Sequence, residues 1–246
     1  MPRTIKLVIE YDGTGYGGWQ RQTNAPSVQA AIEDRLREMT REPALFLRGA
    51  GRTDAGVHAL GQVASFRTEA RIPAEGFRKG VTALLPRDIA VVAAEEMDEA
   101  FDARFSARGK LYRYRILSAP SRAPLRDRFV WHVQKALDLE RMRAAARHLV
   151  GRLDFAAFRA SDCERRTTVR TLDRLDIFAH ADEIVIEVEG DAFLKNMVRI
   201  LAGTLSAVGR GEVSPDEVAR IRDTRDRTQA GMTAPARGLT LVHVRY

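Results

Sequence analysis

A glycine-rich segment near residue 50 combines one carboxylate with one guanidinium. Residues 49–58 are Gly-Ala-Gly-Arg-Thr-Asp-Ala-Gly-Val-His. Asp54 could act as a nucleophile or a base if a partly dry cleft held it ionised, and a nearby cation such as Arg52 would favour that form and orient it. The structural alternative is a hairpin in which Asp54 caps backbone N–H groups and Arg52 pairs with it at the surface. His58 is more typical of a structural residue, since no Ser or Cys nucleophile motif accompanies it.

A second candidate feature is an apolar segment that carries two cations. The spacing of residues 193–208 predicts a helix, with Lys195 and Arg199 on one face at i and i+4. Long side chains at the rim of a buried helix would give the same pattern without any function. A guanidinium among apolar residues needs a carboxylate or a phosphate, because an unpaired buried charge is costly. Asp54 is one candidate partner.

A third feature is a strand that alternates aromatic and basic side chains. Over residues 110–117 the alternation places Tyr112 and Tyr114 on one face and Arg113 and Arg115 on the other. A tyrosine on a basic sheet could stack on an exposed nucleobase, whereas the alternative is a half-buried core residue. No aromatic octapeptide of the RNP type is present, so the sequence does not support an ordinary RRM.

Two further segments have compositions suited to recognition. Residues 11–22, Tyr-Asp-Gly-Thr-Gly-Tyr-Gly-Gly-Trp-Gln-Arg-Gln, contain more aromatics, amides and glycines than a plain connection needs. They predict a recognition loop or, alternatively, a structured turn in which Trp19 fills the core. Arg165, Arg166 and Arg170 could contact phosphates or form a solvated face.

These residues must be positioned by an alternation of strands and helices that occurs twice. The first half predicts strand 4–11, helix 28–41, strands 44–49 and 62–67, helix 74–84 and strand 89–94; the second predicts strand 110–117, helix 138–150, strands 169–179 and 183–189, helices 193–208 and 214–223, and strand 239–245. We therefore expect an α+β fold of two tandem ferredoxin-like (RRM-like) β-α-β-β-α-β units whose antiparallel sheets join around a basic central cleft. The expected domains are residues 1–105, which carry the Asp54 loop, and residues 106–246.

Charge is concentrated in the second half of the chain. The 246 residues have a net charge of +7 and a pI near 10.0. Residues 1–107 have a net charge of −1, whereas residues 108–246 have +8. A basic half without a basic amphipathic anchor favours nucleic acid over a membrane surface as partner. Only five of the 40 cations are lysines, a bias that a GC-rich coding sequence would also produce.

Composition excludes several classes of protein. The longest apolar run, Ile89 to Ala94, is too short to span a bilayer, and the first residues lack the pattern of a secretory signal. We therefore expect a cytoplasmic protein that does not enter a membrane. A single cysteine, Cys163, excludes an internal disulfide and a multi-cysteine zinc site.

Four segments together resemble one enzyme family over nearly the whole chain. They are residues 11–22, Gly-Arg-Thr-Asp-Ala-Gly-Val-His at 51–58, Lys-Leu-Tyr-Arg-Tyr at 110–114 and Phe-Leu-Lys-Asn-Met-Val-Arg at 193–199. In combination they closely resemble the tRNA pseudouridine synthase A (TruA) family, and the ending Gly-Leu-Thr-Leu-Val-His-Val-Arg-Tyr is also similar.

The resemblance implies a fold, a reaction and a set of site residues. The fold would be the pseudouridine synthase fold. The protein would be a homodimeric isomerase that converts uridine to pseudouridine at tRNA positions 38, 39 and 40 in the anticodon stem-loop, without cofactor or metal. Asp54 would be the catalytic aspartate, Arg52 and Arg199 would support it, and Tyr112 would contact the target base.

Two other classes of function would share some of these features. A non-catalytic RNA-binding module would keep the basic half and the tyrosine strand, yet would not need the carboxylate of Asp54. A nucleoside or glycoside hydrolase would need a second carboxylate as general acid, for which Asp12 is the candidate, and would release free base.

Overall fold

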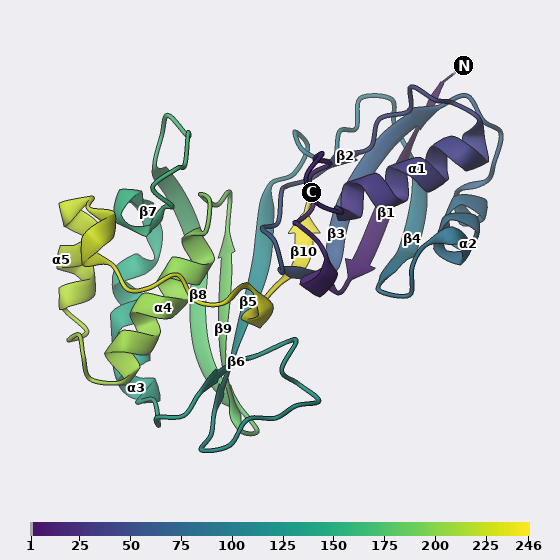
Figure 1. Ribbon diagram of the computed structural model, residues 1–246. Helices are drawn as coiled ribbons and strands as arrows, with labels where there is room; N and C mark the ends of the chain where they lie inside the picture. Colours follow the sequence, from purple (N-terminus) through teal and green to yellow (C-terminus); the bar gives the residue numbers. More distant parts are fainter. Residues whose placement is uncertain (1) are drawn as a thin grey trace. The chain divides into compact units, whose positions relative to one another are not determined.

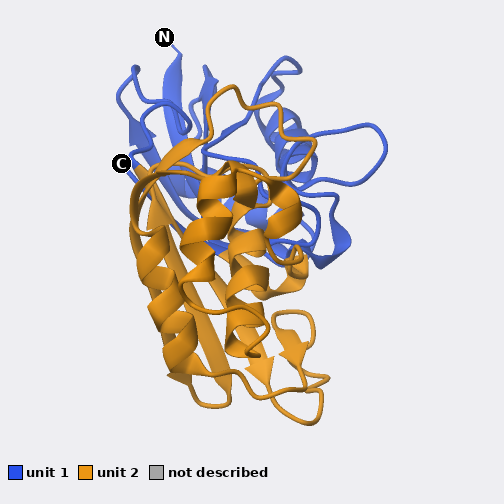
Figure 2. Ribbon diagram, turned by 90° about the vertical axis from the view of Figure 1, so that its left-hand side faces the viewer, with its two compact units in different colours: residues 1–108, 241–246 blue, residues 109–240 orange. Residues whose placement is uncertain are grey.

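The computed structural model describes residues 2–246, and its contacts divide the chain into two compact units, coloured separately in Figure 2. Unit 1 comprises the chain up to Arg108 together with Leu241–Tyr246, and unit 2 comprises Gly109–Thr240. The expected domain boundary between residues 105 and 106 lies three residues before this division. The expected second domain also kept the whole last strand, of which residues 241–245 cluster with unit 1. The division into two domains stays a prediction.

Unit 1 is a sheet with two helices. Its elements are β1 (Arg3–Tyr11), α1 (Val28–Thr40), β2 (Arg48–Gly49), β3 (His58–Thr68), α2 (Ala74–Leu84), β4 (Ile89–Met97) and β10 (Leu239–Arg245). The strands lie in the order β4-β1-β3-β10, with the short β2 paired to β3 (Figure 1). Strand β1 is antiparallel to both β3 and β4. The centre of unit 1 is therefore β1 and β3, and β3 directly follows the Asp54 loop.

One face of the unit 1 sheet carries the core under α1 and α2. Alternate residues of β1, Ile5, Leu7 and Ile9, are fully buried, as strand periodicity requires. They meet the apolar stripes of the helices, of which Val28, Ile32 and Leu36 in α1 and Phe77 and Val81 in α2 are fully buried. Phe66 of β3 lies edge-to-face with Phe77 at 5.2 Å between ring centroids. Side chains from both helices and from the sheet thus fix the position of β3.

Unit 2 is also built of strands and helices. Its strands are β5 (Gly109–Ser118), β6 (Trp131–Val133), β7 (Gly151–Asp154), β8 (Val169–His180) and β9 (Glu183–Gly190), and its helices are α3 (Leu139–Ala146), α4 (Met197–Gly209) and α5 (Glu217–Thr224). The order in the sheet is β5-β9-β8-β7, and β6 is parallel to β5. The protein is therefore α+β, as expected.

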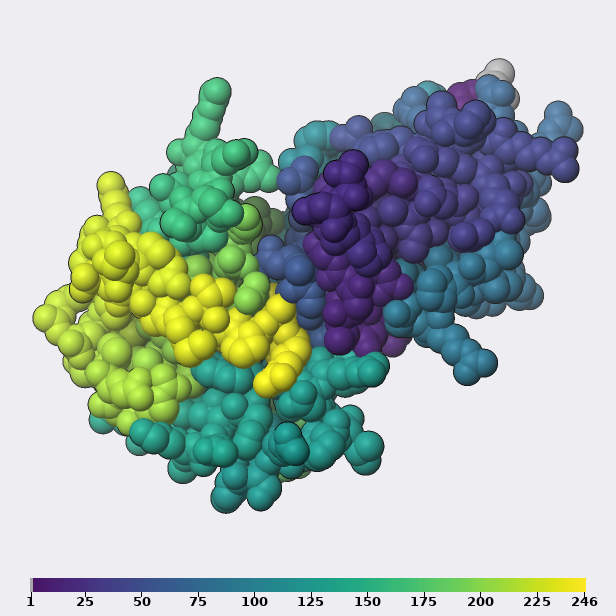
Figure 3. All heavy atoms as spheres, in the orientation of Figure 1, coloured from purple at the N-terminus to yellow at the C-terminus, as the bar shows by residue number. Residues whose placement is uncertain are grey.

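Helix α4 is buried on nearly every side. Of its 13 residues only Arg199 is not classed as buried. The segment after α5 lies along it, since the Gly231 N–H donates to Thr204 Oγ1 at 2.9 Å and the Ala234 N–H to the Arg199 carbonyl at 3.1 Å. Gly203 is needed here, because a Cβ at this position would lie 1.9 Å from the Met232 carbonyl oxygen. In Figure 3 the segment forms a yellow band on the surface of unit 2.

Most expected elements are present, although several bounds differ: the expected helix 138–150 is an α-helix only over Leu139–Ala146, and the expected helix 214–223 lies at Glu217–Thr224. The expected strand 44–49 is a strand only at residues 48–49. The expected helix 193–208 begins at Met197, because Asn196 has a left-handed backbone with φ of 60°. Strands β6 and β7 were not expected. No helix in residues 2–246 has the length and apolarity that crossing a membrane would require.

Candidate active-site loop and its supports

The Asp54 loop is held between two fixed residues at the start of β3. Thr53 is buried, Asp54 is half-buried and Val57 is buried. The Val57 N–H donates to the Asp54 carbonyl at 3.1 Å, which closes a turn directly after the aspartate. On the other side the Thr53 carbonyl accepts the Trp19 N–H at 3.1 Å. The carboxylate of Asp54 is thus carried on a backbone that is bonded before and after it.

The close approach of residues 11–22 to this loop depends on a glycine. Gly18 has a φ of 103°, a conformation that L-residues with side chains rarely adopt. A Cβ at Gly18 would also lie 2.5 Å from the carbonyl oxygen of Thr53. Beside it Trp19 is 2% exposed and fills the core. The burial of Trp19 agrees with the alternative interpretation, a structured turn in which Trp19 fills the core, and residues 11–22 lie against the Asp54 loop.

A buried hydrogen bond ties the end of β1 to the residue before Asp54. The hydroxyl groups of Tyr11 and Thr53 lie 2.8 Å apart, and Tyr11 is 3% exposed. Burial raises the pKa of Tyr11 to about 12, although hydrogen bonds to Thr53 and Gln62 act in the opposite direction. The phenol is therefore neutral at any physiological pH.

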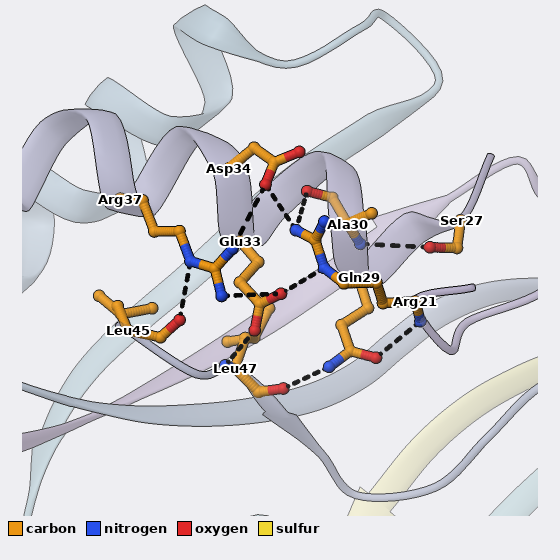
Figure 4. A network of polar contacts seen from close by, with 9 residues as sticks. All are labelled: Arg21, Ser27, Gln29, Ala30, Glu33, Asp34, Arg37, Leu45 and Leu47. Atoms are coloured by element: carbon orange, nitrogen blue, oxygen red, sulfur yellow. Dashed lines mark hydrogen bonds and ion pairs between the residues drawn. The ribbon is translucent and has the colours of Figure 1, made fainter. Parts of the chain in front are cut away.

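Arg21, near the end of residues 11–22, is hydrogen-bonded to side chains of α1, as Figure 4 shows. The Arg21 Nε donates to Glu33 at 2.6 Å, and its backbone N–H donates to the side-chain oxygen of Gln29 at 2.9 Å. Glu33 is 1% exposed and Gln29 2% exposed. A buried carboxylate of this kind is stable only when its oxygens are fully bonded.

Glu33 and Gln29 also bond the chain that leads into the Asp54 loop. Glu33 Oε1 accepts the backbone N–H of Leu47 at 2.9 Å, and the Gln29 amide donates to the Leu47 carbonyl at 2.9 Å (Figure 4). Side chains of α1 therefore bond the backbone N–H and carbonyl of Leu47, which in a strand would pair with a neighbouring strand. This explains why strand β2 begins only at Arg48. Sequence reasoning missed Gln29 and Glu33, although two polar residues on the apolar side of a predicted helix were a usable signal.

Arg52 and His58, on either side of Asp54 in the sequence, differ in exposure. Arg52 is exposed, and its Nε donates to Gln20 at 3.1 Å. His58 is 3% exposed, and its Nδ1 accepts the Gly13 N–H at 3.1 Å. Asp12 Oδ1 lies 3.1 Å from the same nitrogen. The expectation that His58 is structural agrees with this burial, and the carboxylate of Asp12 lies beside its ring.

In unit 2 the two tyrosines of β5 lie on one face, as expected. Tyr114 is fully buried, and its hydroxyl donates to the Pro235 carbonyl at 2.7 Å. Burial also raises the pKa of Tyr114 above its usual range. Tyr112 is 7% exposed and lies edge-to-face with Phe193 at 5.0 Å. Tyr114 is therefore a core residue, and Tyr112 is the member of the pair next to the segment that precedes α4.

On the opposite face of β5 the two arginines are paired. Arg113 bonds Glu187 at 2.7 Å, and Arg115 bonds Glu183 at 2.6 Å. These pairs lie across β5 and β9, where opposite charges stabilise a sheet. Their guanidinium groups therefore have a structural role.

Lys195 and Arg199 do not share a helix face, which corrects the expectation. Lys195 precedes α4, is exposed and pairs with Asp162. Arg199 is half-buried in the first turn of α4, where its Nε donates to the Ala234 carbonyl at 2.8 Å and its Nη1 to the Asn196 side chain at 2.9 Å. The left-handed Asn196 separates the two cations.

The four expected site residues are divided between the two units. Unit 1 holds Arg52 and Asp54, and unit 2 holds Tyr112 and Arg199. Within residues 2–246 no group of three or more His, Cys, Asp or Glu side chains is arranged to hold a metal ion. The side chains of Arg165 and Arg166 are exposed, and Arg170 bonds backbone carbonyls of Thr167 and Val169.

Comparison with known proteins gives one consistent family. The family described as tRNA pseudouridine synthase matches residues 7–106 and 145–246. The tRNA pseudouridine synthase A of Geotalea uraniireducens is 51% identical over 99% of this chain and 100% of that protein. The proteins of the same name from Pelobacter propionicus and Geobacter sulfurreducens are 51% and 49% identical, with the same coverage.

Proposed function

Because this chain belongs to the tRNA pseudouridine synthase family, and is thus an isomerase, we propose that it converts uridine to pseudouridine at positions 38, 39 and 40 of the tRNA anticodon stem-loop. The observation that carries the proposal is the similarity itself, at about half of all residues and over essentially the full length. The Asp54 loop supports it, since a half-buried carboxylate on a doubly anchored backbone suits chemistry on a bound nucleotide. The basic second half suits a polyanionic substrate.

We assign Asp54 the role of catalytic aspartate. The reaction breaks the bond between C1′ and N1, turns the detached uracil, and joins C1′ to C5; a proton leaves C5 and one is gained at N1. Asp54 can attack C1′ as a nucleophile, or it can take a proton from the ribose as a base. Both routes need the ionised carboxylate and no redox change. They resemble glycosidase chemistry without the second carboxylate.

Arg52, Arg199 and Tyr112 complete the proposed site. A base stacked in a stem-loop must leave the stack before it can react, at a cost of roughly a few kcal/mol. The exposed guanidinium of Arg52 suits contact with the RNA near Asp54. Arg199 supports the site as a cation, and Tyr112 contacts the target base. No cofactor takes part in this scheme.

The wider organisation is proposed on the same family similarity. We infer a cytoplasmic homodimer. We also infer two tandem ferredoxin-like units whose sheets join around a basic central cleft. The strand order β4-β1-β3 with β2 paired to β3 in unit 1 supports a ferredoxin-like unit there.

The experiment that tests the proposal is direct mapping of the product. Purified protein is incubated with unmodified tRNA transcripts, and pseudouridine is located by carbodiimide adducts and primer extension. An Asp54→Asn variant is the matched control, because it keeps the shape of the side chain and removes its charge. We expect new stops at positions 38–40 with the parent protein and none with the variant, while both bind tRNA.

Other outcomes would assign the protein differently. Equal modification by Asp54→Asn would refute the role of Asp54. Binding without any modification by the parent would indicate a non-catalytic RNA-binding module. Release of free uracil would indicate a hydrolase, and a change at Asp12 would then be the next variant to examine.

A further inference from the structure

Two exposed phenylalanines and two arginines form a stack on unit 1. Phe46 is 54% exposed and Phe105 is 74% exposed. The guanidinium carbon of Arg48 lies 5.6 Å from the ring centroid of each, and that of Arg104 lies 5.6 Å from the Phe105 ring. We call these four residues the Phe–Arg stack. Cations at such distances over aromatic faces attract the rings electrostatically.

Asp102 organises the stack from within. Its Oδ1 accepts the backbone N–H groups of Arg104 and Phe105 at 2.8 and 3.0 Å, and its Oδ2 pairs with Arg48 Nε at 3.1 Å. Both carboxylate oxygens are thus engaged inside the turn. The carboxylate of Asp102 therefore bonds groups of its own chain, whereas Arg104 is exposed beside the rings.

The turn that carries Phe105 is anchored to the sheet. Ala103 is fully buried, its N–H donates to Ser65 Oγ of β3 at 3.0 Å, and its carbonyl accepts the Tyr246 hydroxyl at 2.8 Å. Backbone fixed in this way has already lost its conformational freedom. The exposure of Phe105 is therefore a property of an ordered surface, and a partner that binds there does not have to order it.

The other phenylalanine lies next to Leu47, in the chain that leads to Asp54. Leu47 is fully buried and both of its backbone groups are bonded by α1, whereas its neighbour Phe46 is 54% exposed. Arg48 opens β2, from which the chain continues into the Asp54 loop. The Phe–Arg stack and the proposed catalytic loop thus share one rigid support.

We propose that the Phe–Arg stack is a second contact surface for the RNA substrate, on which an unpaired nucleobase stacks against Phe105 while its phosphate lies near Arg48 and Arg104. Aromatic and guanidinium planes are the groups on which unstacked bases bind, and guanidinium groups bind phosphate. This inference rests on the proposed function and adds to it an RNA contact beyond the four site residues.

Area and charge favour RNA over a second copy of the chain as the occupant. A stable protein interface buries about 800 Å² on each partner. Two phenyl rings supply only a fraction of that area, since one aromatic side chain buries roughly 150–250 Å². Arg104 is exposed beside the rings, and together with Arg48, whose charge Asp102 partly offsets, it complements a polyanion. A base with its phosphate matches both the size and the charge of the stack.

The first test compares tRNA binding by Phe105→Ala with a matched control. Leu84→Ala also removes an exposed apolar side chain from unit 1, where Leu84 is 44% exposed. Both substitutions are at the surface, so both variants should fold. We expect the Kd for tRNA, measured by filter binding in the Asp54→Asn background, to rise roughly 5- to 100-fold for Phe105→Ala. The Leu84→Ala control should leave it unchanged.

The second test reports stacking directly. In Phe105→Trp a flat ring remains, so tRNA should bind with the parent Kd and should quench the new indole as a base stacks on it. The native Trp19 and Trp131 are 2% and 9% exposed and give a nearly constant background. Leu84→Trp is the matched control, which tRNA should not quench.

The outcomes separate this proposal from the proposed function. If the parent forms pseudouridine while Phe105→Ala keeps its Kd and Phe105→Trp is not quenched, the RNA contact is wrong and the function stands. If the parent forms none while the Phe105 variants behave as expected, the contact stands and the function fails. A change in sedimentation of Phe105→Ala with an unchanged tRNA Kd would overturn the proposal in favour of a protein interface.

Discussion

Removal of the Tyr11 hydroxyl is expected to weaken the support of the Asp54 loop. Tyr11→Phe leaves the Thr53 hydroxyl without its 2.8 Å partner in a site where Tyr11 is 3% exposed. A buried polar group that loses its hydrogen bond costs about 1–3 kcal/mol of stability. Because Thr53 directly precedes Asp54, the rate of isomerisation should fall as well, with tRNA binding retained.

The pH dependence of this effect has a definite sign. The pKa of Tyr11 is raised from 10.0 to about 12 in the folded protein. A raised pKa means that the folded state keeps a proton that the unfolded state loses, so the stabilisation is complete below pH 10 and is lost as the pH rises toward 12. At pH 11 the parent should have lost about 1.4 kcal/mol through this group. Tyr11→Phe has no such loss.

The measurement is urea unfolding of both proteins at several pH values from 8 to 11. A Trp131→Phe background leaves Trp19, whose ring centroid is 6.2 Å from that of Tyr11, as the fluorescent reporter of unit 1. We expect the variant to be less stable at pH 8 and the difference to shrink by about 1.4 kcal/mol at pH 11. Thr53→Val closes a double-mutant cycle, in which the two substitutions together should cost less than their sum. A difference that stays constant with pH would refute the reasoning.

Three further predictions follow from other parts of the molecule. Tyr112→Phe should keep the fold and most of the tRNA affinity but slow single-turnover isomerisation, and an unchanged rate would contradict the role of its hydroxyl. Glu33→Ala should lower the free energy of unfolding in urea by about 3 kcal/mol, because Arg21 loses its buried partner. The control Glu38→Ala, at an exposed residue, should change it by no more than about 0.5 kcal/mol. Equal losses would show that the buried ion pair of Glu33 contributes no more than an exposed one. The tRNA Kd should rise steeply with salt concentration, because counterions are released where the basic residues 108–246 contact phosphates. A Kd that stays the same between about 50 and 200 mM salt would count against phosphate contacts.

Periodicity and capping predicted most helices and strands correctly, because local signals agreed with tertiary contacts. Helix α1 begins directly after Ser27, as the sequence predicted, and the Ser27 hydroxyl accepts the Ala30 N–H. Strand β1 buries the alternate residues that the pattern indicated. Where a local pattern and the packed structure demand the same conformation, sequence alone is sufficient.

The errors lie where side chains from distant segments bond the backbone. Residues 44–47 look like a strand, yet Glu33 and Gln29 of α1 take the backbone bonds of Leu47. The helix that sequence placed from residue 193 begins at Met197, since Asn196 adopts a left-handed backbone that periodicity does not reveal. Both are non-local or conformational effects without a periodic signature.

For the candidate site, the sequence identified the loop but not its supports. The glycines and the charged pair of residues 49–58 marked the segment around Asp54. Its fixation by Tyr11 and by the close approach of Gly18 depends on segments about 40 residues away, as in the Tyr11–Thr53 bond, and is readable only from the folded chain. The roles of Asp54, Arg52, Arg199 and Tyr112 stay predictions.

The last strand of unit 1 has a consequence for how the protein is made. One sheet neighbour of β3 is β10, and the hydrogen bond from Tyr246 to Ala103 joins residues 143 apart in sequence. A ribosome that adds about 5–20 residues per second needs roughly 7–30 s to synthesise that stretch. During this interval the edge of β3 has no partner from β10, and an open edge can pair with other chains. The pairing of β3 with β10 is therefore completed only after the last residues of β10 have been synthesised.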